Sequence, residues 1–117
     1  MSALDKAVAE LDARRSKDDA ARRARQQAAA GFLKEFFDAD LATSKTLKDR
    51  GVQAVFDGKR IVLTKPEEGV YAEAMMIVVG EQGEIDVSGR SLGPVGAADK
   101  DAKKNELIVE IISHFSL

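Results

Sequence analysis

The sequence predicts an α+β fold in which a long N-terminal helical region is followed by a four-stranded antiparallel β-meander and a C-terminal helix (α-β-β-β-β-α). Three observations predict this order. None of the nine glycines precedes Gly31, and eight of them lie between Gly51 and Gly96. Alternating apolar residues flank the dipeptide Asp57-Gly58, which is typical of a hairpin. Apolar residues recur at helical spacing near both ends of the chain.

The first helical region extends from about Ser2 to about Ala42. Ser2 followed by Asp5 resembles a capping box. Three apolar residues then follow at helical spacing: Leu4, Val8 and Leu11. The next positions of this stripe are charged, which a packed helix face excludes: Arg15, Asp18, Arg22 and Arg25. We therefore interpret residues 1–20 as a charged helical arm or separate helix, and residues 21–117 as a single α+β domain.

The clearest local signal is the hairpin around Asp57-Gly58. This dipeptide readily takes the positive φ values of a type I′ turn, so we expect Phe56 to pair with Lys59. One face of the hairpin then carries five apolar residues: Val52, Ala54, Phe56, Ile61 and Leu63. Because Val55 and Val62 lie on the other face, the sheet is predicted to have apolar positions on both faces.

Two further strands are predicted over residues 70–79 and 84–88, followed by a loop over 89–96. The third strand is apolar at every position from Met75 to Val79, so we expect both of its faces to be covered.

The last helix is predicted to begin near Asp99 with an apolar stripe: Leu107, Ile108, Ile111, Ile112 and Phe115. Its charged residues are expected outside that stripe: Lys103, Lys104, Glu106 and Glu110. Two helices of this length cover one face of a four-stranded sheet but hardly two. The remaining apolar surface therefore predicts a homodimer.

The composition argues against several functional classes. The 18 basic and 20 acidic residues leave a net charge of −2, so the whole chain has no general attraction for nucleic acid. The sequence has no cysteine and a single histidine, His114, which argues against a metal site, a cofactor held by thiolates and a cysteine nucleophile. No apolar run is long enough to span a bilayer, and the N-terminus mixes acids with bases, so we expect a cytoplasmic protein without membrane contact.

One segment departs from the balanced charge. Six basic residues lie close together in the sequence: Arg14, Arg15, Lys17, Arg22, Arg23 and Arg25. With Asp18 and Asp19 they give residues 14–25 a net charge of +4, so the rest of the chain carries −6. Such a helix can neutralise phosphates, but it has no aromatic residue for base stacking. Ion pairs of Asp18 with Arg22 and of Asp19 with Arg23 would also stabilise a solvated helix. The pattern favours a solvated helix, or a surface for an acidic partner protein, over nucleic acid.

A second candidate site is a pocket between the sheet and the helices, formed by Tyr71, Glu73, Arg90 and Ser91. Glu73 stands between two alanines in a predicted strand, where an enclosed carboxyl group can serve in acid–base chemistry. The loop over 88–96 combines three glycines with Arg90 and Ser91, but its spacing matches neither a P-loop nor a dinucleotide fingerprint. An outward-facing acid and a connecting loop are the favoured interpretations.

The sequence therefore favours a small cytoplasmic, non-enzymatic binding or adaptor module that forms a homodimer. One alternative is a nucleic-acid-associated protein that uses the basic N-terminal arm. The other is a small-molecule binder or enzyme with a pocket between sheet and helices.

Overall fold

The computed structural model describes residues 2–66, 73–96 and 98–117. Helix α1 (Ala3–Phe36) continues into a π-helical segment, η1 (Phe37–Leu41), and is followed by the short helix α2 (Lys45–Asp49). Five strands come next, and helix α3 (Lys100–Phe115) ends the order. The strands are β1 (Gln53–Phe56), β2 (Arg60–Lys65), β3 (Glu73–Val79), β4 (Glu84–Val87) and β5 (Arg90–Pro94). The predicted α+β class and the order of helix, sheet and helix are confirmed.

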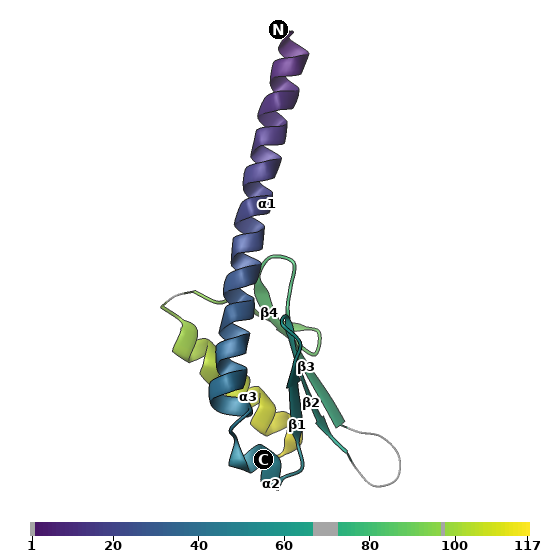
Figure 1. Cartoon of the computed structure of the whole chain (residues 1–117), viewed down its shortest axis with the longest axis vertical. Helices are drawn as coiled ribbons and strands as arrows, with labels where there is room; N and C mark the ends of the chain where they lie inside the picture. Colours follow the sequence, from purple (N-terminus) through teal and green to yellow (C-terminus); the bar gives the residue numbers. More distant parts are fainter. Residues whose placement is uncertain (1, 67–72, 97) are drawn as a thin grey trace.

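The five strands form one antiparallel sheet in the order β1-β2-β3-β4-β5, so each strand pairs with its neighbour in sequence. Helices α1 and α3 cover the same face of this sheet (Figure 1). We call this covered face the inner face and the opposite one the outer face.

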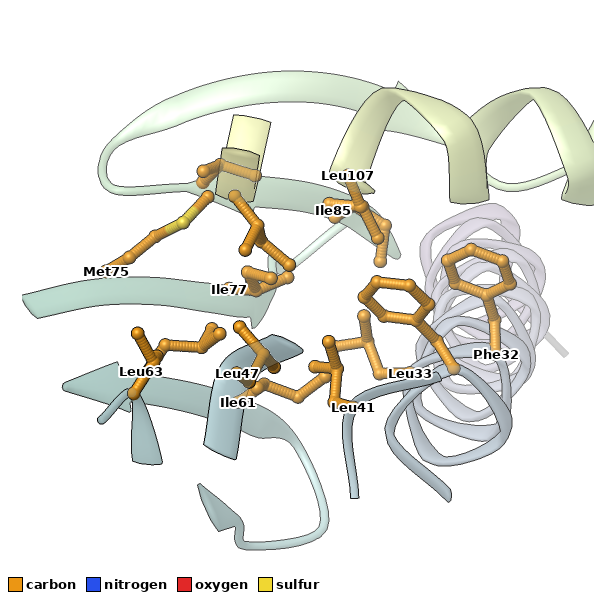
Figure 2. Close-up of a cluster of buried hydrophobic side chains, with 14 of the residues drawn as sticks. Phe32, Leu33, Leu41, Leu47, Ile61, Leu63, Met75, Ile77, Ile85 and Leu107 are labelled. Atoms are coloured by element: carbon orange, nitrogen blue, oxygen red, sulfur yellow. The ribbon is translucent and has the colours of Figure 1, made fainter. Parts of the chain in front are cut away.

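The core lies between the inner face and the two helices. Its side chains come from α1, η1, α2, the central strands and α3, and they point toward one another (Figure 2). The largest fully buried ones are Phe36, Leu33, Ile61, Leu63, Met75, Ile77, Ile85 and Leu107. Burial of each such side chain contributes about 1.5–3 kcal/mol, so this cluster fixes the position of α1 against the sheet.

Helix α1 is much longer than its packed part. It begins at the cap Ser2, whose hydroxyl accepts a hydrogen bond of 3.1 Å from the backbone N–H of Asp5, as the sequence predicts. Its buried residues begin only at Ala29 and end at Phe36. The helix is continuous through residue 20, and the division into an arm and a domain stays a prediction.

The predicted hairpin between β1 and β2 is present, but its turn lies one residue later than expected. Phe56 lies opposite Ile61 instead of Lys59, and the two central residues of the turn are Gly58 and Lys59. Gly58 has a φ of 103°, and a glycine at the first central position is what a type II′ turn requires. Because the partner of Phe56 shifts by two residues, every side chain stays on its predicted face.

The side chain of Asp57 explains this shift. Its carboxylate accepts hydrogen bonds from the backbone N–H of Lys59 (3.2 Å) and from Nε of Arg60 (2.9 Å). The backbone N–H of Asp57 also donates to the carbonyl oxygen of Arg60 (3.1 Å), so Asp57 flanks the turn and is not one of its central residues. The hydrogen bond from Lys59, with a further contribution from Arg60, lowers the pKa of Asp57 below its ordinary value.

The predicted loop over residues 89–96 is wrong, because residues 90–94 form the fifth strand. Val87 lies opposite Arg90, and the two residues between them, Ser88 and Gly89, have φ values of 48° and 90°. Two positive φ values are the requirement of a type I′ turn, so that turn occurs here. Strand β5 lies at the edge of the sheet, where Pro94 can lack an N–H group without breaking a ladder bond.

Helix α3 differs from its prediction at two positions. Leu107, Ile111 and Phe115 are buried as expected, but Ile112 is exposed. Lys103, expected outside the stripe, is only 8% exposed, because it lies one helical turn before Leu107 on the same face. Its ammonium group donates to the carbonyl oxygen of Leu92 in β5 and lies 3.3 Å from the carboxylate of Glu106. The buried stem of Lys103 thus joins α3 to the edge of the sheet.

The expectation that both faces of β3 are covered is met on one face only. Met75 and Ile77 are buried on the inner face, whereas Met76 on the outer face is 41% exposed. On the neighbouring hairpin, Val55 also points outward and is 61% exposed. Among the segments that the structure describes, none covers this outer face.

Candidate protein-binding surface on helix α1

The first part of helix α1 projects from the body of the protein (Figure 1). We call residues 3–21 the arm, since every residue from 2 to 21 is exposed. The arm consists mostly of good helix formers, with alanine at six of its positions, and it begins at the cap provided by Ser2. Asp5 in the first turn adds a favourable interaction with the helix dipole. The cap, the helix formers and the continuity with the packed part of α1 therefore all favour the helical form of the arm.

One side of the arm carries an apolar stripe. Leu4, Val8 and Leu11 are 72%, 49% and 46% exposed. Since each residue turns the helix by 100°, these three side chains fall within an arc of about 60°. So narrow a stripe is typical of a helix that packs against one other helix or into a groove. We call these three residues the arm stripe.

The six basic residues of the candidate binding segment all lie on helix α1, in the arm and just beyond it. Arg14, Arg15, Lys17 and Arg23 are exposed. Arg22 pairs with Asp19 at 2.9 Å, so the ion pair predicted between Asp18 and Arg22 is replaced by one of three-residue spacing. Both partners are about half exposed, and such a pair adds little stability.

Arg25 has a structural role instead. Its Nε donates to the carbonyl oxygen of Gln82 (3.2 Å) and its Nη2 donates to the side-chain oxygen of the same residue (3.3 Å). The next residue is Gln26, whose side-chain amide donates to the carbonyl oxygen of Glu81 (2.7 Å). These contacts tie α1 to the turn between β3 and β4.

Gly83 allows this close approach. Its φ is 79°, and a Cβ placed there would lie 2.6 Å from Cβ of Arg25 and 2.8 Å from its backbone carbon. Only glycine fits both the backbone conformation and the space. We call the contact between Gly83 and Arg25 the junction, because the helix leaves the body there. The sequence shows a glycine in a turn but does not show which helix lies against it.

Among the described residues of the predicted pocket, Glu73 is not brought together with Arg90 and Ser91. Tyr71 lies outside the described residues. Glu73 begins β3 and its backbone lies opposite Lys65. Arg90 lies opposite Val87, whose other neighbour Ile77 is four residues along β3 from Glu73.

Arg90 and Ser91 make local contacts within the fold. The guanidinium of Arg90 pairs with the carboxylate of Glu110 in α3. The hydroxyl of Ser91 accepts a hydrogen bond of 3.2 Å from the backbone N–H of Gly93. These contacts connect β5 to α3 and shape the edge of the sheet.

An apolar groove of about 260 Å³ lies elsewhere, between η1, α2 and α3. It is lined by Leu41, Leu47, Ile108 and Ile111, with Asp40 at its margin. The ammonium group of Lys104 forms an ion pair of 2.8 Å with the carboxylate of Asp40, and its hydrogen bond to Asp40 raises the pKa of Lys104 above its ordinary value. The carboxylate beside the groove therefore joins η1 to α3.

Within residues 2–66, 73–96 and 98–117, no group of three or more histidine, cysteine, aspartate or glutamate residues is placed to hold a metal ion. No helix found there combines the length and the apolar character needed to cross a membrane. Comparison of the chain with protein-family models, with curated proteins and with solved structures finds no match.

Proposed function

We propose that the protein is a small cytoplasmic, non-enzymatic binding or adaptor module that works as a homodimer and presents the arm to a partner protein. One observation carries the proposal: nineteen consecutive residues of α1 are helical and exposed, and they carry a narrow apolar stripe. Isolated helices of this length are marginal in water, and exposed leucine and valine side chains gain free energy when a partner covers them.

The arm fits a helix-in-groove mode of recognition. Leu4, Val8 and Leu11 have the spacing i, i+4, i+7 of the anchor residues that such helices place in an apolar groove. The basic residues Arg14, Arg15 and Lys17 follow directly. They favour a partner whose groove ends in an acidic rim, because opposite charges speed association and fix the orientation.

Photo-crosslinking of the full chain in its own cells tests this proposal. A photoreactive amino acid replaces Ala7, next to the arm stripe, and in a second sample it replaces Lys48 on α2. We expect a defined protein adduct from position 7 that is not formed from position 48. The double substitution Leu4→Asp with Leu11→Asp should reduce this adduct by about tenfold or more, because it removes two anchors of the contact.

The matched control is Ala9→Asp with Ala13→Asp. These residues are exposed on the opposite side of the arm, and the substitutions add the same two negative charges. This control should keep the adduct. Equal loss in both double variants, or no adduct from position 7 above the level at position 48, would refute the proposal.

A nucleic acid is the second candidate ligand, and the placement of the basic residues favours it. At 100° per residue, all of them except Arg23 fall within an arc of about 160° on α1. Asp18 lies inside this arc and weakens it. We propose this contact only for a ligand held through its phosphates.

Fluorescence anisotropy with a labelled duplex DNA and a labelled single-stranded RNA, at about 50 and 200 mM salt, tests this second candidate. Affinity should fall with salt and be lost in the variant Arg14→Ala, Arg15→Ala, Lys17→Ala. The control Lys45→Ala, Lys48→Ala, Arg50→Ala removes three equally exposed charges near α2 and should leave affinity unchanged. Absence of binding at the lower salt concentration excludes this function.

A further inference from the structure

The outer face of the sheet carries an apolar row across three strands. Val55 lies opposite Val62, and Val62 lies opposite Met76, so their side chains stand side by side. Val78 extends this surface along β3, because it lies two residues from Met76 on the same face. A contiguous outward apolar surface on a sheet marks a place where another surface packs.

Two opposite charges flank this apolar surface. Arg60 in β2 and Asp86 in β4 both lie opposite Val78, one on each side of it. Arg60 uses Nε for Asp57, and its two terminal nitrogens carry four further donors. No ion pair to Asp86 occurs among the residues that the structure describes. The cross-strand row through Val78 therefore has a basic side chain at one end, Arg60, and an acidic one at the other, Asp86.

We propose that the outer face binds a second copy of this chain, with a two-fold axis that runs along β3 between the two sheets. This inference rests on the homodimer in the proposed function and identifies its surface. The axis exchanges the two sides of β3 but leaves positions along it unchanged. Arg60 then faces Asp86 of the partner subunit, Asp86 faces Arg60 of the partner subunit, and Val78 and Met76 each meet their own copies.

The charges select this axis. If the two-fold axis ran across the strands, with its centre between Met76 and Val78, Arg60 would face Val62 of the partner subunit. Both charges of each copy would then be buried against uncharged side chains, which is costly. Of these two axes, only the one along β3 pairs Arg60 of each copy with Asp86 of the other, which is the reciprocal contact expected at an interface between two identical subunits.

The area of the outer face sets the expected affinity of the dimer. Five strands about 4.8 Å apart, the longest with seven residues at about 3.3 Å each, give a face of about 20 Å by 23 Å. This is small for a stable interface, so we expect a dimer with a dissociation constant in the micromolar range. Helix α1 lies roughly along the strands (Figure 1), so the same axis directs both arms toward the same end of the dimer.

Sedimentation velocity of the full chain between about 1 and 100 µM tests the surface. The wild-type chain should change from monomer to dimer in this range. Met76→Lys places a charge at the centre of the interface and should raise the dissociation constant by about tenfold or more. Val109→Lys changes an exposed apolar residue on α3, away from the outer face, and should leave the dimer unchanged.

A charge-exchange cycle tests the axis. Arg60→Glu alone and Asp86→Lys alone place like charges together, and each should weaken the dimer by about fivefold or more. The double variant Arg60→Glu with Asp86→Lys should restore the wild-type constant to within about threefold. Asp57→Asn removes the intrachain partner of Arg60 and should leave the dimer intact. Circular dichroism verifies that each variant is folded.

A wild-type chain that stays monomeric up to about 100 µM, or a folded Met76→Lys variant that dimerises normally, overturns the proposal. Failure of the double variant to recover overturns the axis. The test is separate from that of the arm. Leu4→Asp with Leu11→Asp should still dimerise, and Met76→Lys should still form the adduct from position 7.

Discussion

The two halves of helix α1 have the same backbone conformation and opposite surroundings. From Ala29 to Phe36 the helix packs against the sheet and α3, with Leu33 and Phe36 almost fully buried. From Ala3 to Ala21 every residue is exposed. A continuous helix thus has two sources of stability: burial of apolar surface in one half, and local propensity with a cap in the other. Substitutions in the first half should affect the whole fold, and those in the second should affect only the arm.

Among these substitutions, Leu33→Ala is expected to have the largest effect on the free energy of unfolding. This side chain is fully buried, so its truncation leaves a cavity and should lower the free energy of unfolding by about 2–5 kcal/mol. Leu11→Ala removes the same atoms from an exposed position in the arm and should change it by less than about 0.5 kcal/mol. Urea denaturation followed by circular dichroism measures both. Similar losses in the two variants would mean that the arm is part of the cooperative unit.

The next effect concerns the junction between the two halves. Gly83→Ala combines a positive φ with a clash against Arg25 and should cost about 1–3 kcal/mol. Gly51→Ala is a matched control, because Gly51 has a φ of 73° but no atom within 4 Å of the added Cβ. The difference in unfolding free energy between the two variants isolates the contact with α1. A difference of zero would show that the helix can move away from the turn without cost.

A smaller effect depends on pH. The hydrogen bond to Asp40 raises the pKa of Lys104 above its ordinary value. This pair therefore adds stability below the ordinary pKa of lysine, and that stability is lost as the pH rises through the higher pKa of the folded state. The difference in stability between the wild-type chain and Lys104→Met should shrink from pH 9 to about pH 12. Exchange of the arm amides, corrected for the intrinsic rate, should be the same in both proteins.

The smallest effect on the whole molecule is that of Ser2→Ala. Loss of this cap costs about 1 kcal/mol locally, which corresponds to about fivefold faster hydrogen exchange at Asp5 and Lys6. The urea midpoint should not change, because the arm is not packed. A lowered midpoint would show that the first turn contributes to global stability.

The class of fold and the strand faces could be predicted from the sequence, because apolar periodicity reports which side of an element is buried. Leu33 and Phe36 fall in the part of the first helical region that the sequence assigns to the domain, and Ile61 and Leu63 fall on the predicted apolar face of the hairpin. The face of α1 that packs against the sheet is harder to predict from the sequence. Ala29 is buried, whereas its neighbour Ala28 is exposed. Alanine has little apolar surface, so its pattern hardly distinguishes one helix face from the next.

The turns are harder to predict from the sequence than the strand faces. The sequence predicts a type I′ turn at Asp57-Gly58, but the structure has that turn at Ser88-Gly89, where the sequence predicts only a loop. The difference lies in the hydrogen bonds of the Asp57 side chain, which local composition does not reveal. Strand β5 was missed because its residues include Gly93 and Pro94, which are depleted in strands.

The candidate sites could be predicted only in part. The basic residues of α1 were identified, but the contact of Arg25 with Gln82 depends on residues 57 positions apart. The outward valines Val55 and Val62 were visible in the alternation. The opposition of Arg60 and Asp86 across Val78 required the strand register, which sequence patterns leave undetermined.

Helix α1 is continuous through the junction, so the rotation of the arm about the helix axis is fixed relative to the body. Since the helix does not bend freely between Arg25 and the arm stripe, the direction in which Leu4 and Leu11 face is set by the body. Insertion of one residue near Ser16 would turn that direction by about 100°, whereas insertion of seven would return it to within about 20° and only lengthen the reach by about 10 Å. A partner held on the arm is thus oriented about the helix axis as well as positioned along it.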